Sequence, residues 1–239
     1  MSSSLAAVIP EPVAERDRAR RLGLYGLLAH WDEVRGQEWL PRLLEIEDAE
    51  RRRRSLERRI RSARIGAFKP MADFDWEWPK KIHRPTIEEL FTLQFVQEGA
   101  NVVLLGPNGV GKSMIARNLA YQALLRGYTA RFTAASDMLT DLAAQPTSGA
   151  LARRLRRYCN PMLLCVDEVG YLSYDNRYAD LLFEVVTRRY EQRSIVLTSN
   201  RGPDEWLATF ADPVRAQSAI DRFTSMAYDL QIEGESYRG

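Results

Sequence analysis

The sequence lacks long apolar runs and has few cysteines and histidines among its 239 residues. No stretch approaches the roughly 18 apolar residues of a membrane-spanning helix, so we expect no membrane anchor. The N-terminal segment also lacks the apolar core of a signal peptide, which predicts a cytoplasmic protein. Cys159 and Cys165 are too few for a disulfide framework, and both are expected to be unreactive thiols. His30 and His83 have no metal-ligating neighbours at a useful spacing, so neither is expected to bind a metal.

The charge is nearly balanced in total but uneven along the chain. There are 34 Lys and Arg residues against 32 Asp and Glu residues, a net charge of +2. The 45% hydrophobic and 28% charged residues are typical of a soluble globular protein. Between Arg51 and Lys69, however, nine basic residues accompany a single acidic residue, Glu57. Such a block is informative about binding partners rather than about the fold.

Hydrophobic periodicity and proline content divide the chain into three parts. The apolar spacing predicts a helix over 13–31 and a longer one over 39–64. Three prolines and four aromatic residues follow, which indicates an ordered linker. After a short helix over 87–97, apolar strands alternate with helices, as in a parallel sheet covered on both faces. The predicted organisation is a helical domain over 1–65, a linker over 66–86 and an α/β domain over 87–239.

The segment GPNGVGKS, Gly106 to Ser113, follows the apolar strand 102–105 and satisfies the pattern of a phosphate-binding P-loop. Its glycines allow the backbone N–H groups to turn inward around phosphate oxygens, and Lys112 supplies a positive charge to the β- and γ-phosphates. The hydroxyl of Ser113 is a ligand for Mg²⁺. The predicted ligands are therefore ATP and Mg²⁺. The predicted nucleotide-binding residues are Gly106, Pro107, Asn108, Gly109, Val110, Gly111, Lys112, Ser113 and Met114.

A second apolar strand, 162–166, ends in two acidic residues, which is a Walker B pattern. Carboxyl ends of parallel strands meet at the ligand-binding edge of an α/β sheet. Asp167 is therefore predicted to hold Mg²⁺ together with Ser113. Glu168 is predicted to orient and deprotonate the water that attacks the γ-phosphate.

A third apolar strand ends at Thr198, Ser199 and Asn200. Its end would carry a polar sensor of the γ-phosphate, with Asn200 as the first candidate and Thr198 or Ser199 as alternatives. The alternative is that Asn200 is an N-cap or turn residue before Gly202 and Pro203. Arg222 and Arg238 are candidates for stabilising the charge of the transferring phosphoryl group, although surface arginines are common.

Six segments in this order resemble the IstB/DnaC group of AAA+ ATPases: GPNGVGKS, LLCVDEVGYL, RRYEQRSIVLTSN, EW, DRF and GESYR. The run ERRRRSLERRIRSARIGAFKPMADFDWEW is similar to the IstB side of that group. The resemblance covers residues 20–239. It implies a P-loop AAA+ three-layer αβα sandwich, with a parallel sheet of order 5-1-4-3-2, no full lid and a small helical domain in front.

The resemblance also implies roles for several residues. Arg222 would be an arginine finger that acts on the ATP of a neighbouring subunit, and Arg238 a second sensor in its own subunit. Residues 135–158 would be the helical insertion that faces DNA in initiator-type members. The sequence departs from the usual pattern at Ser113, where threonine is usual, and in the segment after Arg222, which lacks the expected histidines.

The basic block could be a solvated helix face, and the acidic residues just before it could neutralise it. Eight arginines without a lysine nevertheless favour phosphate contact, and nothing in the sequence indicates a base-reading module. We therefore expect largely sequence-independent DNA binding. The candidate residues are Arg51, Arg52, Arg53, Arg54, Arg58, Arg59, Arg61, Arg64, Arg153, Arg154, Arg156 and Arg157.

The sequence thus predicts an ATPase that assembles on DNA as a homo-oligomer, with ATP at the subunit interfaces, and regulates a transposase or integrase. Two alternatives remain at this stage. A replicative helicase loader would use the same ATPase with a helicase as its partner. A nucleotide-gated DNA scaffold would bind ATP with negligible turnover.

Overall fold

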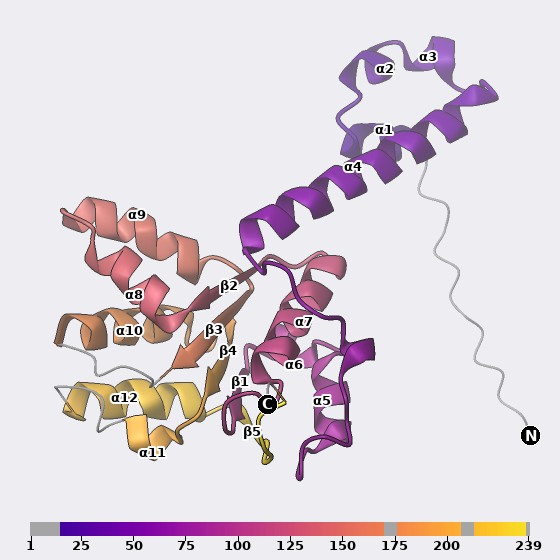
Figure 1. Ribbon diagram of the computed structural model, residues 1–239. Helices are drawn as coiled ribbons and strands as arrows, with labels where there is room; N and C mark the ends of the chain where they lie inside the picture. The colour runs from indigo at the N-terminus through magenta and orange to yellow at the C-terminus, as the bar shows by residue number, and fades with distance from the viewer. Residues whose placement is uncertain (1–14, 170–175, 207–212, 238–239) are drawn as a thin grey trace, which may run out of the picture. The chain divides into compact units, whose positions relative to one another are not determined.

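A computed structural model describes residues 15–169, 176–206 and 213–237 of the chain (Figure 1). The chain divides into two compact units, which we call the N-terminal unit, Met1–Glu57, and the core unit, Arg58–Gly239. In the described ranges, no helix is both long enough and apolar enough to cross a membrane.

The N-terminal unit is helical. Its small core contains Ala19, Leu22, Leu40 and Leu44, all 5% exposed or less, because these side chains recur at helical spacing on facing helices. Partly buried leucines and Trp31 pack around them. The helices are α1 (Glu15–Arg21), α2 (Tyr25–Ala29), α3 (Trp31–Val34) and α4 (Trp39–Ala63), the last of which continues into the core unit.

Two helices that the periodicity predicts as continuous are interrupted. The described part of segment 13–31 contains α1, α2 and the first residue of α3, and Gly23, with φ of 63°, ends α1. The N–H groups of Gly23 and Leu24 bond back to Arg20 and Ala19, which is the Schellman arrangement at a helix end. The segment 87–97 is likewise divided, at Leu93. Apolar spacing alone does not detect such breaks, since both sides of the break still face the core.

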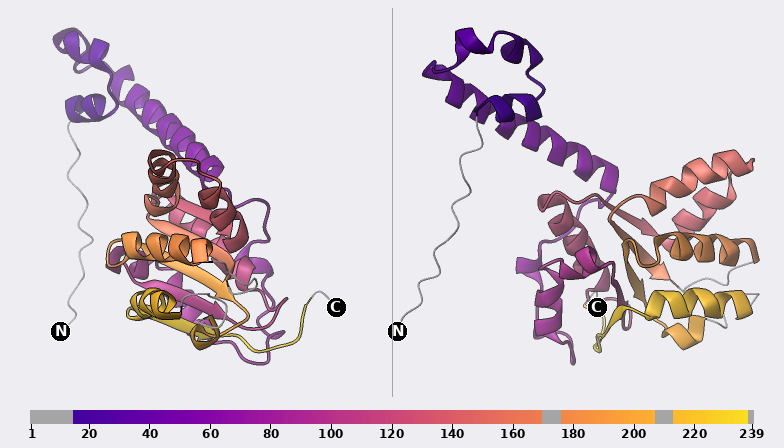
Figure 2. Two further views of the ribbon diagram at one scale, coloured as in Figure 1. Left: turned by 90° about the vertical axis from the view of Figure 1, so that its left-hand side faces the viewer. Right: turned by 180° about the vertical axis from the view of Figure 1, so that it is seen from behind.

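The core unit contains a five-stranded parallel sheet with the order β2-β3-β4-β1-β5 (Figures 1 and 2). This is the predicted order 5-1-4-3-2 read from the opposite edge, so the fold prediction is confirmed. The strands are β1 (Asn101–Leu105), β2 (Ala130–Ala134), β3 (Leu163–Val169), β4 (Ser194–Ser199) and β5 (Ala227–Gln231).

Helices cover both faces of the sheet, which makes three layers. Figures 1 and 2 show α5, α6 and α7 on one face and α8, α9, α10 and α12 on the other. A 3₁₀ turn, η1 (Met71–Asp73), lies in the linker region. The helices are α5 (Arg84–Leu90), α6 (Gln94–Glu98), α7 (Lys112–Leu125), α8 (Ala135–Ala143), α9 (Ser148–Cys159), α10 (Asn176–Arg189), α11 (Pro203–Trp206) and α12 (Pro213–Thr224).

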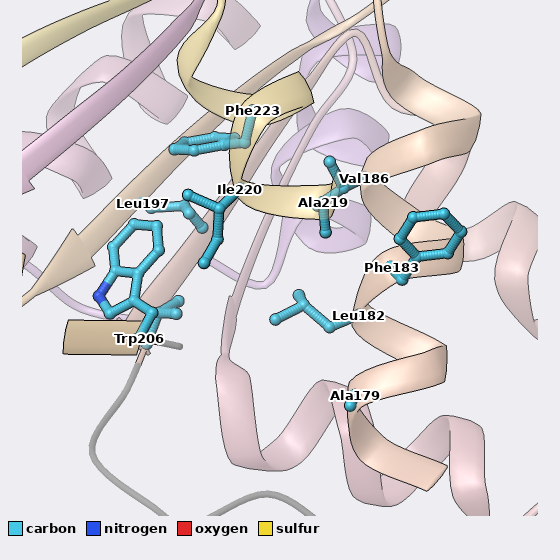
Figure 3. Close-up of a pocket in the computed structure, with 10 residues that line it drawn as sticks. Ala179, Leu182, Phe183, Val186, Leu197, Trp206, Ala219, Ile220 and Phe223 are labelled. Atoms are coloured by element: carbon cyan, nitrogen blue, oxygen red, sulfur yellow. The ribbon is translucent and has the colours of Figure 1, made fainter. Parts of the chain in front are cut away.

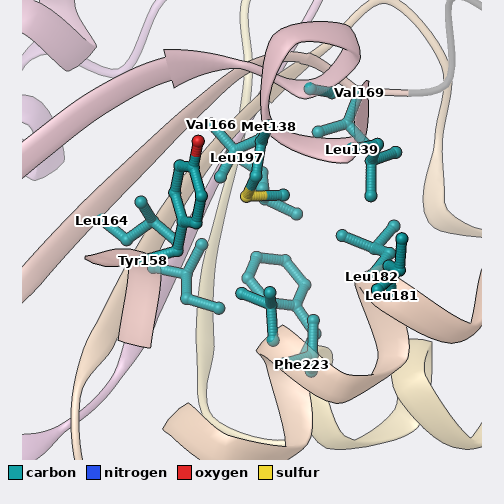
Figure 4. Packing of buried hydrophobic residues seen from close by; sticks show 14 of the residues in the cluster. Met138, Leu139, Tyr158, Leu164, Val166, Val169, Leu181, Leu182, Leu197 and Phe223 are labelled. Carbon is teal, nitrogen blue, oxygen red and sulfur yellow. The ribbon is translucent and has the colours of Figure 1, made fainter. Parts of the chain in front are cut away.

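Successive residues of each strand serve opposite faces of the sheet. Leu164 and Val166 of β3 belong to the large cluster under α8, α9, α10 and α12 (Figure 4). The thiol of Cys165, between them, donates to the carbonyl oxygen of Ala116 on α7, at 3.5 Å. Cys159 and Cys165 are both buried and free, as the sequence predicts. Burial on both faces explains why β1, β3 and β4 are largely apolar along their length. Because these strands are parallel, the polar residues at the carboxyl ends of β3 and β4 lie at the same edge of the sheet.

Candidate nucleotide-binding site

The P-loop lies at the carboxyl end of β1, between β4 and β5. The N–H of Gly106 donates to the carbonyl oxygen of Ser199 at the end of β4, at 3.2 Å. On the other side, the N–H of Ile232 donates to Leu105, at 2.8 Å. The loop is therefore held by both strands that neighbour β1, and α7 begins at Lys112, within the P-loop sequence.

Three glycines of the loop have a left-handed or related backbone and no room for a side chain. Gly106, Gly109 and Gly111 have φ of 149°, 82° and 95°. A Cβ atom would collide with the carbonyl of Ile232 at Gly106, with Ser236 at Gly109 and with the ring of Phe74 at Gly111. The loop thus requires glycine at these positions on two independent grounds.

Lys112 is the first residue of α7 and is only 8% exposed. Its Nζ donates to the carbonyl oxygens of Gly106 and Pro107, both at 2.7 Å. Burial lowers the pKa of Lys112, while the nearby carboxylates of Asp167 and Glu168 oppose that shift. The ammonium group is thereby held within the curl of the loop, where a phosphate would bind.

A cluster of hydroxyl and carboxylate groups joins the P-loop helix to the ends of β3 and β4. Ser113 Oγ donates to Oδ1 of Asp167, at 2.8 Å. The hydroxyl of Thr198 donates to the same oxygen. The predicted metal ligands Ser113 and Asp167 therefore lie side by side, and Thr198 belongs to the same cluster.

Glu168 has an unusual backbone, with φ of 61° in the left-handed region that non-glycine residues rarely adopt. The pairing of β3 with β4 shifts register between Val166 and Val169, so Glu168 lies in a bulge. Its N–H donates to Thr198 Oγ1, at 3.0 Å. The bulge turns the exposed carboxylate out of the strand alternation, and such strain is typical of functional positions.

The other candidate sensors have different environments. Asn200 is exposed just beyond β4. Ser199 is buried and has a structural role, because its hydroxyl donates to the carbonyl of Val169 and accepts from the indole of Trp206. Of the three residues, Thr198 is the one bonded to the Walker B carboxylate.

Arg222, on α12, contacts α10 of the same chain. Its Nη1 donates to Thr187 Oγ1 at 2.8 Å, and its guanidinium lies 5.3 Å from the ring centre of Phe183. Figure 3 shows Leu182 and Ile220 beside a neighbouring cavity of about 30 Å³, which is apolar and too small for a nucleotide. Arg238 lies outside the described residues.

Two segments that are distant in sequence cover the P-loop. Phe74 of the linker is buried against Gly111, and Ser236 lies against Gly109. The N–H of Tyr237 donates to the carbonyl of Gly109, at 3.2 Å, and its ring packs edge-on against Trp78 with centres 5.1 Å apart. The aromatic content of the linker indicated that it would be ordered, but no sequence signal indicated these contacts.

The arginines of α4 are largely paired with acids of the same helix. Arg51 lies 3.8 Å from Glu47, and Arg52 lies 2.5 Å from Asp48. Arg53 and Arg54 share Glu50, and the bonds from these two guanidinium groups lower the pKa of Glu50 to about 2. All of these pairs are exposed, so each contributes little to stability and phosphates can compete for the arginines.

The remaining predicted DNA contacts belong to the core unit. Arg59 is half-buried and donates to the carbonyl of Leu124, at 3.1 Å, which directs it into the protein. Arg154 lies 3.6 Å from Asp141. The remaining arginines are exposed on α9, on α4 or just after α4: Arg58, Arg61, Arg64, Arg153, Arg156 and Arg157.

The geometry fits a bound nucleotide with Mg²⁺. The loop has three glycines with positive φ, which allow the tight backbone curl of a phosphate-binding loop, and a buried ammonium lies within it. Ser113 and Asp167 supply the oxygen ligands that Mg²⁺ prefers, and phosphates and water would complete its coordination. Among the described residues, no group of three or more His, Cys, Asp or Glu side chains is arranged to hold a metal ion.

Comparison with known proteins identifies the family. The family of IstB-like ATP binding proteins matches residues 24–239. The chain belongs to this family. It is 36% identical, over 84% of its length and 80% of the relative's, to a protein named for insertion sequence IS5376 of Geobacillus stearothermophilus. It is 33% identical, over 94% of both chains, to a Mycobacterium tuberculosis insertion-sequence protein. Both relatives are named as ATP-binding proteins.

Solved structures confirm the AAA+ fold of this IstB-like protein. The crystal structure of DnaI matches with a TM-score of 0.57 and 21% identity, over 72% of this chain and 90% of that one. The DnaC helicase loader matches with a TM-score of 0.56 and 18% identity, over 72% and 97%. At this identity the similarity concerns the fold alone.

Proposed function

We propose that this IstB-like protein hydrolyses ATP and uses the bound nucleotide to assemble on DNA and regulate a transposase. The ATPase activity in this proposal is supported by the cluster of hydroxyl, carboxylate and ammonium groups at the carboxyl edge of the sheet. There Lys112, Ser113 and Asp167 adjoin Glu168, whose strained backbone is bonded to Thr198. A structural turn would have no need for two carboxylates and a buried ammonium at one point.

Each residue has a distinct task in this reaction. The N–H groups of the P-loop and the ammonium of Lys112 bind the phosphates. Ser113 and Asp167 would hold Mg²⁺, which supplies positive charge against the negative charge of the phosphoryl group. Glu168 accepts the proton of the attacking water. Thr198 fixes the backbone of Glu168 and the orientation of Asp167.

The Glu168→Gln variant tests the ATPase assignment. The amide keeps the size of the side chain but cannot accept the proton, so ATP binding should persist while phosphate release falls by about 100-fold or more. Binding is measured with a fluorescent ATP analogue, and phosphate release is followed with and without DNA. Full turnover in the variant would refute the assignment. Negligible turnover in the wild-type protein would favour a nucleotide-gated scaffold.

The DNA and transposase parts rest on the family and on the surface charge. The relatives are named for insertion sequences, whose movement requires a transposase acting on DNA. A replication initiator of the same fold was solved bound to AMPPCP and single-stranded DNA, with a TM-score of 0.55. The arginines of α4 and α9 offer a sequence-independent phosphate contact in this protein.

Assembly would place ATP between subunits. In this arrangement Arg222 would leave Thr187 and reach the phosphates of a neighbouring subunit, and Arg238 would act on the nucleotide of its own. A guanidinium group can donate paired hydrogen bonds to the oxygens of the transferred phosphoryl group, over which negative charge spreads during the reaction.

A helicase loader is the second candidate, because the fold covers 97% of the DnaC loader and 90% of DnaI. The relatives that are at least 30% identical favour transposition instead. Co-purification separates the two functions: a loader retains a hexameric helicase, whereas a transposition protein retains the transposase encoded beside it.

A further inference from the structure

The N-terminal unit contains a groove between α1 and α4 that the sequence did not reveal. It has a volume of about 340 Å³. Figure 1 shows the two helices side by side, and Ala19, Leu22, Leu40 and Leu44 pack between them. The groove is lined by Arg18, Arg21, Leu22, Asp48, Arg51, Arg52 and Ser55.

The lining residues follow helical spacing on both walls. On α1, Arg18 and Arg21 are three residues apart. On α4, Asp48, Arg51 and Arg52 are spaced so that they share one face. One face of each helix therefore contributes two arginines, and the apolar contact between the helices fixes the two pairs opposite each other.

The two walls differ in how their charges are balanced. On α4, Arg52 pairs with Asp48 and Arg51 lies 3.8 Å from Glu47. Among the described residues, neither Arg18 nor Arg21 makes an ion pair, although Arg20 of the same helix pairs with Asp17, at 3.4 Å. The groove thus holds four guanidinium groups against one carboxylate. Such a concentration of like charge favours a bound anion.

We propose that this groove binds the phosphodiester backbone of duplex DNA, with Arg18 and Arg21 as contacts additional to the arginine run of α4. The inference rests on the DNA binding proposed above and assigns it a defined site. A DNA backbone matches the groove because guanidinium groups on both walls can take successive phosphates through paired N–H donors. Contacts to backbone phosphates carry no sequence information, so binding through this groove is independent of sequence.

The test compares two double variants of α1 in the full-length protein. Arg18→Ala/Arg21→Ala removes two groove arginines, whereas Arg16→Ala/Arg20→Ala removes the same charge from residues that do not line the groove. Binding to a random-sequence duplex is measured by fluorescence anisotropy over a series of salt concentrations. The first variant should bind about tenfold more weakly and reduce the salt slope by about 1.8, the value for two lost phosphate contacts. The second variant should change both quantities much less.

A third variant distinguishes the loss of a DNA contact from a folding defect, because it is expected to strengthen DNA binding. Asp48→Asn removes the carboxylate of the groove and frees Arg52, so it should strengthen DNA binding, whereas Glu45→Gln on the same helix should have little effect. Equal losses of DNA affinity in the two double variants, or no gain of DNA affinity in Asp48→Asn, would overturn the groove assignment. Either result would leave the proposed DNA binding of the protein in place. A wild-type protein that fails to bind duplex would refute both the groove and the proposed DNA binding.

Discussion

Thr198 connects the two acidic residues of the site. Its hydroxyl donates to Asp167 and accepts from the N–H of Glu168. One side chain thereby contacts both the proposed metal ligand, Asp167, and the strained backbone of the proposed catalytic base, Glu168. A valine of the same shape would remove both bonds without creating a cavity.

We predict that Thr198→Val lowers the rate of ATP hydrolysis by about tenfold or more but changes ATP affinity by less than about threefold. The P-loop still binds the phosphates, whereas Glu168 loses the bond that fixes its backbone. Steady-state phosphate release and titration with a fluorescent ATP analogue measure the two quantities. Thr133→Val at the end of β2 is the matched control, and an equal loss of rate there would contradict the role of Thr198.

The site residues differ in how far the sequence could reveal them. Lys112, Ser113, Asp167 and Glu168 were predictable because the P-loop and Walker B patterns are continuous in sequence. The sequence did not indicate that Thr198, rather than Asn200, would bond to Asp167 and Glu168. That arrangement depends on the bulge that shifts β3 against β4. Long-range packing of the linker and the C-terminal segment on the P-loop leaves no local pattern at all.

At the scale of elements, Arg189 joins α10 to the sheet. It is 1% exposed, and its guanidinium donates to five carbonyl oxygens, those of Tyr158, Cys159, Pro161, Met162 and Ser194. Burial lowers the pKa of Arg189 to about 9, which still leaves it a cation at neutral pH. The helical spacing places it on the same face as Leu182 and Val186, which was the one sequence signal of its burial.

We predict that Arg189→Met lowers the free energy of unfolding by about 3–5 kcal/mol, because five carbonyl groups, three of them in buried hydrogen bonds, lose the donor that Arg189 supplies. Urea denaturation followed by circular dichroism measures the change. Arg188→Ala serves as the control on the same helix, since Arg188 is exposed and pairs with Glu184, at 2.7 Å. Arg188→Ala should change the free energy of unfolding by no more than about 0.5 kcal/mol. Similar losses in the two variants would contradict the anchoring role.

The elements themselves were mostly predictable. The strands expected over 102–105, over 162–166 and before Thr198 are present, because strands buried on both faces give apolar runs that are easy to recognise. The interruptions of the helices could not be predicted, because Gly23 and Leu93 change the backbone direction while the apolar spacing continues. The groove between α1 and α4 depends on this break, because Gly23 ends α1 and allows the chain to turn before it returns as α4.

At the scale of the whole molecule, the account requires that subunits complete one another's sites. Mixing Lys112→Ala subunits with Arg222→Ala subunits tests this requirement. Each variant alone should be inactive, but a 1:1 head-to-tail assembly should recover about a quarter of the wild-type ATPase rate. The active interfaces are those that combine an intact P-loop with an intact Arg222. Thr187→Val, which removes the internal hydrogen-bond partner of Arg222, should retain activity. No recovery on mixing would contradict action between subunits.

In the proposed function, ATP bound by the P-loop controls assembly on DNA. Mass photometry of the protein with a random-sequence duplex, with and without ATP and Mg²⁺, measures this dependence. We expect multi-subunit complexes on DNA that require ATP and that are absent for Lys112→Ala. The same complexes formed by Lys112→Ala, or by the wild-type protein without nucleotide, would contradict it.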